Sequence, residues 1–266
     1  RRNETALEQL RQEYGIAVTS DNQRVIQEAD VVFLAVKPQM FSSVIAEIKD
    51  NGKFDAICEA YFGDGEKNGV ASAELDTSKD QLVVATNAAF EPFEYKKGDE
   101  FYGIDMEIAA LLAEHLDKEL VIQDMEFDAV CMTVGQHKCD IAMAGLTINE
   151  ERKEYVEFSD SYYTANQKLV VRGDDTTFDE CKTLEDVEKI LNGLDETKKA
   201  GFQNGTTGNW YVVGDADWGF DGLKVEGKGY SNGSLAVQDL INKNIDFVVI
   251  DADPAKFITD AINLVA

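Results

Sequence analysis

Apolar residues form two kinds of pattern along the chain. Short continuous apolar runs occur at residues 30–37, 82–86, 140–144 and 247–250. Such runs are typical of strands that are buried on both faces of a parallel sheet. Elsewhere apolar residues recur every three or four positions, which predicts amphipathic helices at residues 41–62, 104–116, 183–191, 234–242 and 254–262. The alternation of strands and helices predicts an α/β fold.

A stretch rich in glycine and acidic residues, 63–81, interrupts this pattern. It has no apolar period, so it predicts a linker. Before it, residues 1–40 alternate helices and short strands, like half of a dinucleotide-binding sheet. The next helix, 41–62, is expected to break at Asn51-Gly52. Residues 1–62 are therefore predicted to contain a Rossmann-like fragment together with a strand and a final helix that complete the first of the lobes described next.

Two further α/β units are predicted after the linker. Residues 82–172 read as strand, helix, strand, helix, strand, with an extended segment at 168–172. This order implies parallel strands joined by right-handed crossovers. Residues 173–266 contain helices and strands at 200–203 and 247–250. The prediction is two lobes, each a mostly parallel sheet flanked by helices, with a cleft between them.

The charge of the chain excludes some classes of partner. The sequence has 51 acidic and 25 basic residues in 266, a net charge of −26. Such a polyanion is not expected to hold nucleic acid or an anionic bilayer through a general field. No apolar run approaches the length of a membrane span, so direct membrane insertion is not expected either. The chain lacks both an initial Met and an export signal, which suggests a processed or engineered N-terminus.

Cysteine and histidine give little support to catalysis or metal binding. Cys131, His137 and Cys139 are close in sequence, but there is no CxxC pair and no evident fourth ligand. Free thiols are expected, although a Cys131–Cys139 disulfide stays open. We predict no catalytic residues, no metal site and no cofactor.

The stretch 143–163 carries the clearest binding chemistry. A strand ends in Ala144-Gly145, where another molecule can approach the backbone, and Thr147 and Arg152 follow. Free N–H groups, a hydroxyl and a guanidinium together suit a carboxylate. The alternative is that Arg152 is a solvated helix charge paired with Glu150 or Glu151, and the pattern alone does not decide.

Two other strand ends offer complementary chemistry. The strand that ends at Gln203 runs through a Gly-Thr-Thr turn, with Thr206 and Thr207, into a helix, which favours an anion. Asp251 follows the strand 247–250, at the end where ligands collect in open α/β sheets. The alternative for Asp251 is a helix cap.

Five motifs resemble the polar amino-acid-binding proteins of ABC importers, and the glutamine-binding branch is nearest. They are ATNAAFEPFEY (85–95), YGIDMEIA (102–109), the stretch 143–163, QNGTTG (203–208) and IDFVVID (245–251), in family order over more than 180 residues. The resemblance implies the two-lobed type II periplasmic binding protein fold. It also implies an extracytoplasmic location, at the periplasm or lipid-anchored at the cell surface, and the membrane subunits of an ABC importer as partners.

The resemblance implies a role for each site residue. Arg152 would hold the α-carboxylate of a free amino acid, helped by Thr147, Gly145 and the Thr207 amide, and Asp251 would pair with the α-ammonium. Phe90 and Phe127 would flank the ligand side chain. Asn87 stands where many relatives have an acid, and Gln203 where the glutamine binder has Lys, which favours a neutral polar ligand. Ala144 and Thr206 complete the predicted set.

The N-terminal region resembles a different family. ADVVFLAVKPQMF (29–41) is similar to pyrroline-5-carboxylate reductase, in which Ala35, Lys37 and Pro38 would lie beside the nicotinamide half of NADP. The glycine-rich phosphate turn of that family has no match. Residues 12–18 and 47–65 resemble the return strand and final helix of the binding-protein family. This order predicts a circular permutation or an engineered chimera, with the linker joining the old termini.

The expected function is non-catalytic capture of a free polar amino acid in the cleft, as the solute receptor of an ABC importer. Two alternatives stay open at this point. One is an NADP-dependent, reductase-like protein. The other is an engineered chimera or scaffold that has lost binding.

Overall fold

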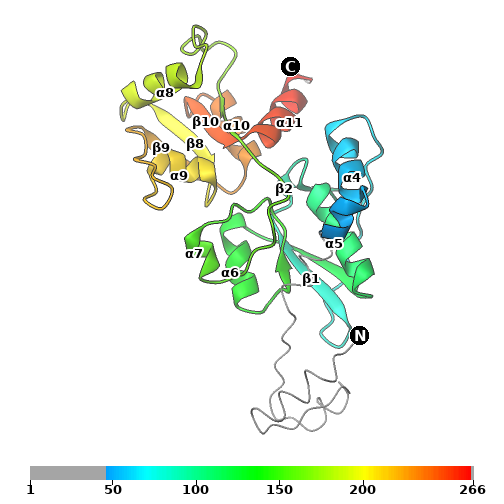
Figure 1. Cartoon of the computed structure of the whole chain (residues 1–266). Coiled ribbons are helices and arrows are strands. Elements are labelled where there is room, and N and C mark those ends of the chain that lie inside the picture. The colour runs from blue at the N-terminus through cyan, green and yellow to red at the C-terminus, as the bar shows by residue number, and fades with distance from the viewer. Residues whose placement is uncertain (1–45, 265–266) are drawn as a thin grey trace. The chain divides into compact units, whose positions relative to one another are not determined.

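The computed structural model describes residues 46–264 (Figure 1). All of them belong to the second of the two units into which the chain divides, Phe41–Ala266. Within this unit the structure has two main sheets of largely parallel strands, each covered by helices. The predicted α/β fold with two lobes is confirmed. The NADP-related residues Ala35, Lys37 and Pro38 lie outside the described residues.

The first lobe is built on a parallel sheet with the order β5-β1-β6. The strands are β1 (Gln81–Thr86), β5 (Glu119–Asp124) and β6 (Ile141–Ala142). Side chains alternate across β1: Leu82 and Val84 enter a core with α5 (Ile104–His115), while Ala85 enters a cluster with Phe127. The short helices η1 (Phe127–Ala129) and α6 (Val130–Gly135) cover that second face. Burial of both faces explains why β1 reads as a continuous apolar run.

A small antiparallel sheet follows β1 along the chain. It contains β2 (Ala89–Phe90), β3 (Glu94–Lys97) and β4 (Glu100–Tyr102). These strands are two to four residues long, too short to show a period in the sequence. A turn at Gly98, with φ of 65°, joins β3 to β4.

Helix α4 (Lys53–Phe62) packs onto the first lobe. The predicted break is confirmed, since residues 46–50 are helical and Gly52 then adopts φ of 77°. Ile57 and Tyr61 enter the core with Leu112 of α5. The Tyr61 hydroxyl also accepts the Gly103 N–H at 2.9 Å. This packing suits the permutation, which stays a prediction because residues 12–18 lie outside the described part.

The predicted linker is docked against the first lobe. Val70 is buried and exchanges two backbone hydrogen bonds with Phe101, of 2.7 and 2.9 Å. The Lys67 ammonium lies 5.5 Å from the Tyr61 ring centre and 5.4 Å from that of Phe257, which belongs to the second lobe. A single buried valine gives no apolar period, so the docking was not visible in the sequence.

The second lobe is built on a four-stranded sheet with the order β7-β10-β8-β9. Its strands are β7 (Gln167–Val170), β8 (Lys199–Gln203), β9 (Glu226–Tyr230) and β10 (Phe247–Asp251). The neighbours β8, β9 and β10 are parallel, and β7 is antiparallel to β10. The pairing of Leu169 with Val249 places residues 167–170 in the second lobe, whereas the predicted boundary at 172 put them in the first.

Helices cover both faces of the second sheet. They are α8 (Leu184–Gly193), α9 (Thr207–Val213), α10 (Gly233–Ile241) and α11 (Ala252–Asn263). Along β10, Phe247 and Val249 pack in a cluster with Val212 of α9, while Val248 and Ile250 pack in another with α10 and α11. The period of two residues in a strand produces this division. Strand β9 was not predicted because its sequence, EGKGY, is polar and mostly exposed.

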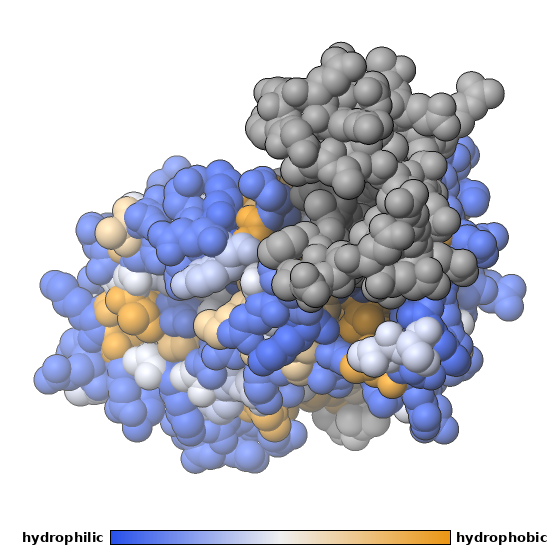
Figure 2. Space-filling model, turned by 90° about the horizontal axis from the view of Figure 1, so that it is seen from below, coloured by the Kyte–Doolittle hydropathy of each residue, from blue (hydrophilic) through white to orange (hydrophobic). Residues whose placement is uncertain are grey.

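The described surface is polar. Figure 2 shows hydrophilic residues over most of the visible face, with small separate hydrophobic areas. Within residues 46–264, no helix has both the length and the apolar character needed to cross a membrane.

Candidate functional site

Arg152 lies on a one-turn helix that is fixed at its start. This helix, α7 (Glu150–Lys153), follows a loop that leaves β6 and passes Gly145, where φ is 55°. The Asn149 side chain caps it by accepting the Arg152 N–H at 2.8 Å. The cap and the left-handed glycine set the direction in which Arg152 leaves the backbone.

Two backbone carbonyl groups hold the Arg152 guanidinium. Nη1 donates to the Thr147 carbonyl at 2.7 Å, and Nη2 donates to the Gly205 carbonyl at 3.0 Å. Glu150 instead pairs with Lys153 at 2.7 Å. Among the described residues Arg152 has no salt bridge, so the alternative of a solvated helix ion pair is wrong.

Two aromatic rings sandwich the same guanidinium. Its carbon Cζ lies 5.3 Å from the ring centre of Phe127 and 5.3 Å from that of Trp210. Desolvation lowers the pKa of Arg152 from its ordinary value, but the group stays protonated near neutral pH. A guanidinium has five N–H donors, and two are used here. The others suit a planar anion.

Thr147 and Thr207 join the two lobes directly. Their hydroxyl oxygens are 3.1 Å apart. Thr207 begins α9, and the buried Thr206 caps that helix by accepting the Asn209 N–H at 3.4 Å. The Thr206 hydroxyl also donates to the Gln203 carbonyl at 2.8 Å. These bonds place the Gly-Thr-Thr turn beside Thr147.

Asn87 and Gln203 also meet across the two lobes. The Gln203 Nε2 donates to Asn87 Oδ1 at 2.9 Å and to the Ser231 carbonyl at 3.2 Å. The Asn87 Nδ2 donates to the Met125 carbonyl at 2.7 Å. Both side chains are buried, and Gln203 Oε1 has no hydrogen-bond partner among the described residues. The pair therefore presents a free acceptor.

Asp251 is the last residue of β10, and its carboxylate does not cap the helix that follows. It is the residue that precedes α11, yet its side chain makes no capping hydrogen bond. Its Oδ1 instead accepts Gln167 Nε2 at 2.9 Å. Burial raises the pKa of Asp251 to about 6. The alternative that Asp251 serves as a helix cap is therefore wrong.

Phe90 and Gly145 pack together, whereas Ala144 belongs to the core. A Cβ atom on Gly145 would lie 3.4 Å from the Phe90 ring. The Ala144 side chain is buried with Ala85 and Phe127 in the apolar cluster under β1. Ala144 therefore packs in the core beneath the site and does not face the ligand.

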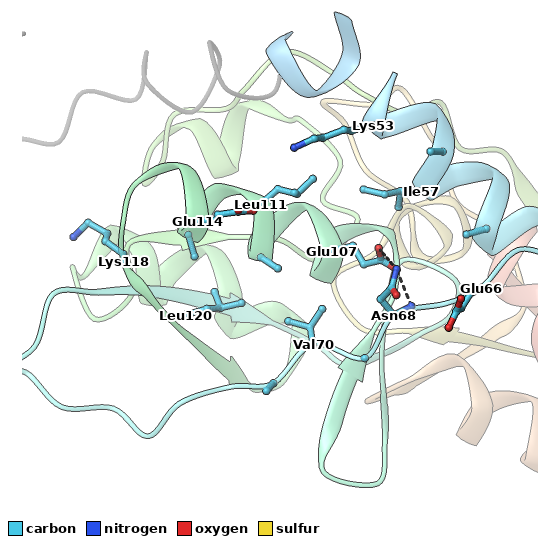
Figure 3. Close-up of a pocket in the computed structure, with 16 residues that line it drawn as sticks. Lys53, Ile57, Glu66, Asn68, Val70, Glu107, Leu111, Glu114, Lys118 and Leu120 are labelled. Atoms are coloured by element: carbon cyan, nitrogen blue, oxygen red, sulfur yellow. Dashed lines mark hydrogen bonds between the residues drawn. The ribbon is translucent and has the colours of Figure 1, made fainter. Parts of the chain in front are cut away.

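A hollow elsewhere on the first lobe contains none of the predicted ligand residues. It has a volume of about 700 Å³ and lies between α4 and α5, with Ile57, Val70 and Leu111 in its wall (Figure 3). Glu107 there accepts two hydrogen bonds from Asn68, both of 3.1 Å. Because none of the predicted ligand residues lines this hollow, we place the candidate site at the lobe junction.

Four residues near the site were not predicted. Trp210 stacks on Arg152, and Gln167 donates to Asp251. Glu94 and Asp105 are fully buried acids next to Gly145. Buried acids leave no signal that separates them from surface acids in a chain with 51 acidic residues.

Cys131 and Cys139 are both free and buried, so they form no disulfide with each other. Within the described residues there is also no cluster of three or more His, Cys, Asp or Glu side chains that could hold a metal ion.

Two family profiles match separate parts of the chain. The profile of the bacterial extracellular solute-binding proteins, family 3, matches residues 82–252. A profile described as NADP oxidoreductase, coenzyme F420-dependent, matches residues 1–57. The first match covers every predicted ligand residue. The second covers the region predicted to resemble a reductase fragment and supports the interpretation of the chain as a chimera.

Curated proteins are similar to this chain over part of their length. The arginine-binding extracellular protein ArtP of Bacillus subtilis is 38% identical over 106 residues, 40% of this chain and 42% of that protein. The L-arginine-binding protein of Pseudomonas aeruginosa is 28% identical over 170 residues, 64% of this chain and 60% of that protein. The chain thus spans 42% to 60% of the length of these two relatives.

Solved structures share the fold. The ancestral amino acid-binding protein AncCDT-1, a precursor of cyclohexadienyl dehydratase, is 30% identical with a TM-score of 0.58, over 69% of this chain and 75% of that chain. An ancestral arginine-binding protein bound to arginine is 33% identical with a TM-score of 0.57, over 70% and 76%. The predicted type II periplasmic binding protein fold is confirmed.

Proposed function

Because the chain belongs to the bacterial extracellular solute-binding proteins, family 3, we propose that it binds a free amino acid without catalysis, at the junction of its two lobes. The observation that carries this proposal is Arg152, a cation without an acidic partner among the described residues, held between two aromatic rings. We further propose that it serves as the solute receptor of an ABC importer, outside the cytoplasm.

The two charged ends of the amino acid would meet different residues. Arg152 has free N–H donors for the α-carboxylate, and the hydroxyls of Thr147 and Thr207 lie beside it. Asp251 would accept the α-ammonium. Gln167, which bonds to Asp251, lies against Gly208, the neighbour of Thr207. Paired opposite charges in a partly buried site give affinity for a zwitterion.

The end of the ligand side chain would meet Asn87 and Gln203. Gln203 Oε1 is a buried acceptor without a partner among the described residues, and such a group favours a ligand that supplies an N–H donor. Neither Asn87 nor Gln203 is charged, so we propose a neutral amide such as glutamine ahead of a cation. The arginine-binding relatives make arginine the competing ligand.

A thermal-shift screen of the common amino acids tests the proposal. A specific ligand raises the melting temperature by mass action, by an amount set by its concentration relative to Kd. We expect L-glutamine to give the largest shift and L-arginine a smaller one. A protein that no amino acid stabilises would contradict the proposed function, and a larger shift with arginine would contradict only the preference for a neutral side chain.

Arg152→Ala and Asp251→Ala test the site assignment by titration calorimetry. Each removes one partner of a charged group and should weaken binding by about 100-fold or more, since truncation of a buried charge partner costs about 3 kcal/mol or more. Lys153→Ala and Asp260→Ala are matched controls. Both residues form exposed ion pairs, Lys153 on α7 next to Arg152 and Asp260 on α11, the helix that follows Asp251. Unchanged affinity in both site variants would refute the assignment.

A further inference from the structure

Glu94 is a fully buried acid without a partner. It begins β3 and is 0% exposed. Neither of its carboxyl oxygens has a hydrogen-bond partner among the described residues. Burial of an ionised carboxylate without a partner costs several kcal/mol. A neutral carboxylic acid avoids most of this cost, so the surroundings of Glu94 favour a bound proton.

The Glu94 carboxyl group lies beside the candidate site. Its Oε1 is 3.9 Å from the position of a Cβ on Gly145, and the Phe90 ring is 3.4 Å from that position. On the same glycine, the N–H donates to Asp105 Oδ2 at 3.2 Å. Gly145 thus lies between two buried acids at the point where the ligand would approach the backbone.

The groups around Glu94 supply negative charge. Asp105 on α5 and Asp251 at the end of β10 both act on it. Tyr162 donates its hydroxyl to Asp105 Oδ1 at 2.6 Å, and β2 contributes Phe90, which does not titrate. Lys96 and Lys97, on the same strand, are exposed. Within residues 46–264, no Lys or Arg forms an ion pair with Glu94 or Asp251, so the cluster lacks a counter-ion.

Electrostatics favours protonation of this cluster in the free protein. Burial, followed by the charges of Asp105 and Asp251, raises the pKa of Glu94 well above its ordinary value. Burial raises the pKa of Asp105 and of Asp251 to about 6. Neighbouring carboxyl groups in a desolvated site cannot all ionise at once.

We propose that Glu94 is a proton-exchanging residue of the amino-acid site, neutral in the free protein and ionised once the ligand's ammonium group occupies the space beside Gly145 and Asp251. The inference rests on the proposed function. The ligand keeps its own protons, and the O–H bond of the Glu94 carboxyl breaks and its proton passes to solvent. The ammonium group of the ligand thus replaces the proton that Glu94 loses, and the net charge of the acids together with the ligand's ammonium stays the same.

The exchange makes affinity depend on pH. If binding releases about one proton, the association constant rises about tenfold per pH unit, for as long as Glu94 is protonated in the free protein. Asp105 and Asp251, with pKa values of about 6, are already largely ionised at about pH 7.5. Proton release at that pH therefore reports on Glu94.

Calorimetry at about pH 7.5, in two buffers with different ionisation enthalpies, counts the protons. L-Glutamine and L-arginine are the probes. The wild-type protein should release about one proton per bound amino acid, and Glu94→Gln about none. Glu107→Gln is the matched control, because Glu107 lies on the neighbouring helix α5 and its carboxylate accepts two hydrogen bonds from Asn68. It should release the same number as the wild type.

Several outcomes would overturn the proposal. If the wild-type protein binds the amino acid without releasing a proton, the proposal is wrong, and this test needs no variant. Release that persists in Glu94→Gln and disappears in Asp105→Asn assigns the proton to Asp105. Absence of any binding heat or thermal shift with either amino acid refutes the proposed function itself, which separates the two failures.

A second measurement covers the case in which Glu94→Gln does not fold. The NMR signal of the Glu94 carboxyl carbon in the wild-type protein distinguishes the acid from the carboxylate. We expect the chemical shift of an acid in the free protein at about pH 7.5, and that of a carboxylate after saturation with the amino acid. The same shift in both states would contradict the exchange.

Discussion

At the scale of single residues, the anchoring of Arg152 decides what it can bind. Carbonyl groups carry only partial negative charge, so the bonds to Thr147 and Gly205 orient the guanidinium without neutralising it. A carboxylate partner would have satisfied the positive charge within the protein. The full charge of Arg152 thus stays available to an anion in a partly desolvated setting, where electrostatic attraction is stronger than in water.

Trp210 should contribute to binding through Arg152. Trp210→Ala removes one of the two rings that hold the guanidinium, at 5.3 Å, and a cation–π contact of this kind stabilises by about 1–2 kcal/mol. We expect the Kd for the amino acid to rise about tenfold in calorimetric titrations. Trp210→Phe keeps a ring in place and should bind nearly as well as the wild type.

Trp218→Ala is the control for this effect. Trp218 stacks on Trp210 at 5.9 Å but is 38% exposed and has no contact with Arg152 in the described structure. Its loss should change Kd less than twofold. Equal losses in Trp210→Ala and Trp218→Ala would show that the aromatic stack matters as a whole and would contradict a specific role for the ring on Arg152.

The sequence predicted Arg152 and Asp251 but not the residues that hold their side chains. Asp251 ends β10 and Arg152 follows the loop after β6, and in open α/β sheets ligands collect at the ends of the strands. The partners Trp210 and Gln167 come from segments 58 and 84 residues away, respectively. The Arg152–Trp210 contact depends on how the two lobes meet, and the Gln167–Asp251 contact depends on the pairing of β7 with β10. No local sequence pattern records either.

At the scale of elements, α4 belongs to the core of the first lobe although it precedes the predicted linker. Ile57 is buried against α5, and Tyr61 bonds to the backbone at Gly103. A helix that supplies buried side chains to a lobe is part of its stability. The packing fits the prediction that this helix corresponds to the final helix of the family.

Ile57→Ala should therefore destabilise the first lobe. Truncation of a buried isoleucine removes apolar contacts and leaves a cavity, which costs about 2–4 kcal/mol. The free energy of unfolding can be measured by urea denaturation monitored by tryptophan fluorescence and circular dichroism. Glu59→Ala, on the exposed side of the same helix, should change stability by about 0.5 kcal/mol or less. Equal small effects would show that α4 is a dispensable addition.

Helices and central strands were predicted more completely than peripheral strands. Strands β1 and β10 are buried on both faces and read as continuous apolar runs. Strand β9 is exposed at the edge of its sheet, and β2 has two residues. Their hydrogen bonds depend on a neighbouring strand and not on their own side chains, so their sequences resemble loops.

At the scale of the whole molecule, two groups of acidic residues with shifted pKa values have opposite effects on pH stability. Partly exposed acids such as Asp239, held by hydrogen bonds from Lys228 and Tyr230, have a lowered pKa and stabilise the fold once ionised. The buried acids Glu94, Asp105 and Asp251 have a raised pKa. They bind protons more tightly in the folded than in the unfolded state, and therefore stabilise the fold while protonated.

Above about pH 4, the ordinary pKa of a carboxyl group, the buried acids should determine how the free energy of unfolding changes with pH. Asp105 has a folded pKa of about 6, so its contribution is complete below about pH 4 and is lost as the pH rises to about 6. We expect the free energy of unfolding to fall across this window. In Asp105→Asn the fall in the free energy of unfolding between about pH 4 and about pH 6 should be smaller by roughly 2–3 kcal/mol. Urea denaturation at a series of pH values measures this.

Asp260→Asn is the control, because its ion pair with Lys256 is exposed and should leave the slope unchanged. A profile that rises between about pH 4 and about pH 6 in the wild type would contradict the sign of this prediction.

The ammonium of Lys67 makes cation–π contacts with two aromatic rings, Tyr61 from α4 and Phe257 from α11. A hinge motion that parts the lobes must pull this cation away from at least one ring. The linker 63–81 would then restrain opening of the lobes, and the strength of its two aromatic contacts would limit how far the lobes separate when no ligand is bound.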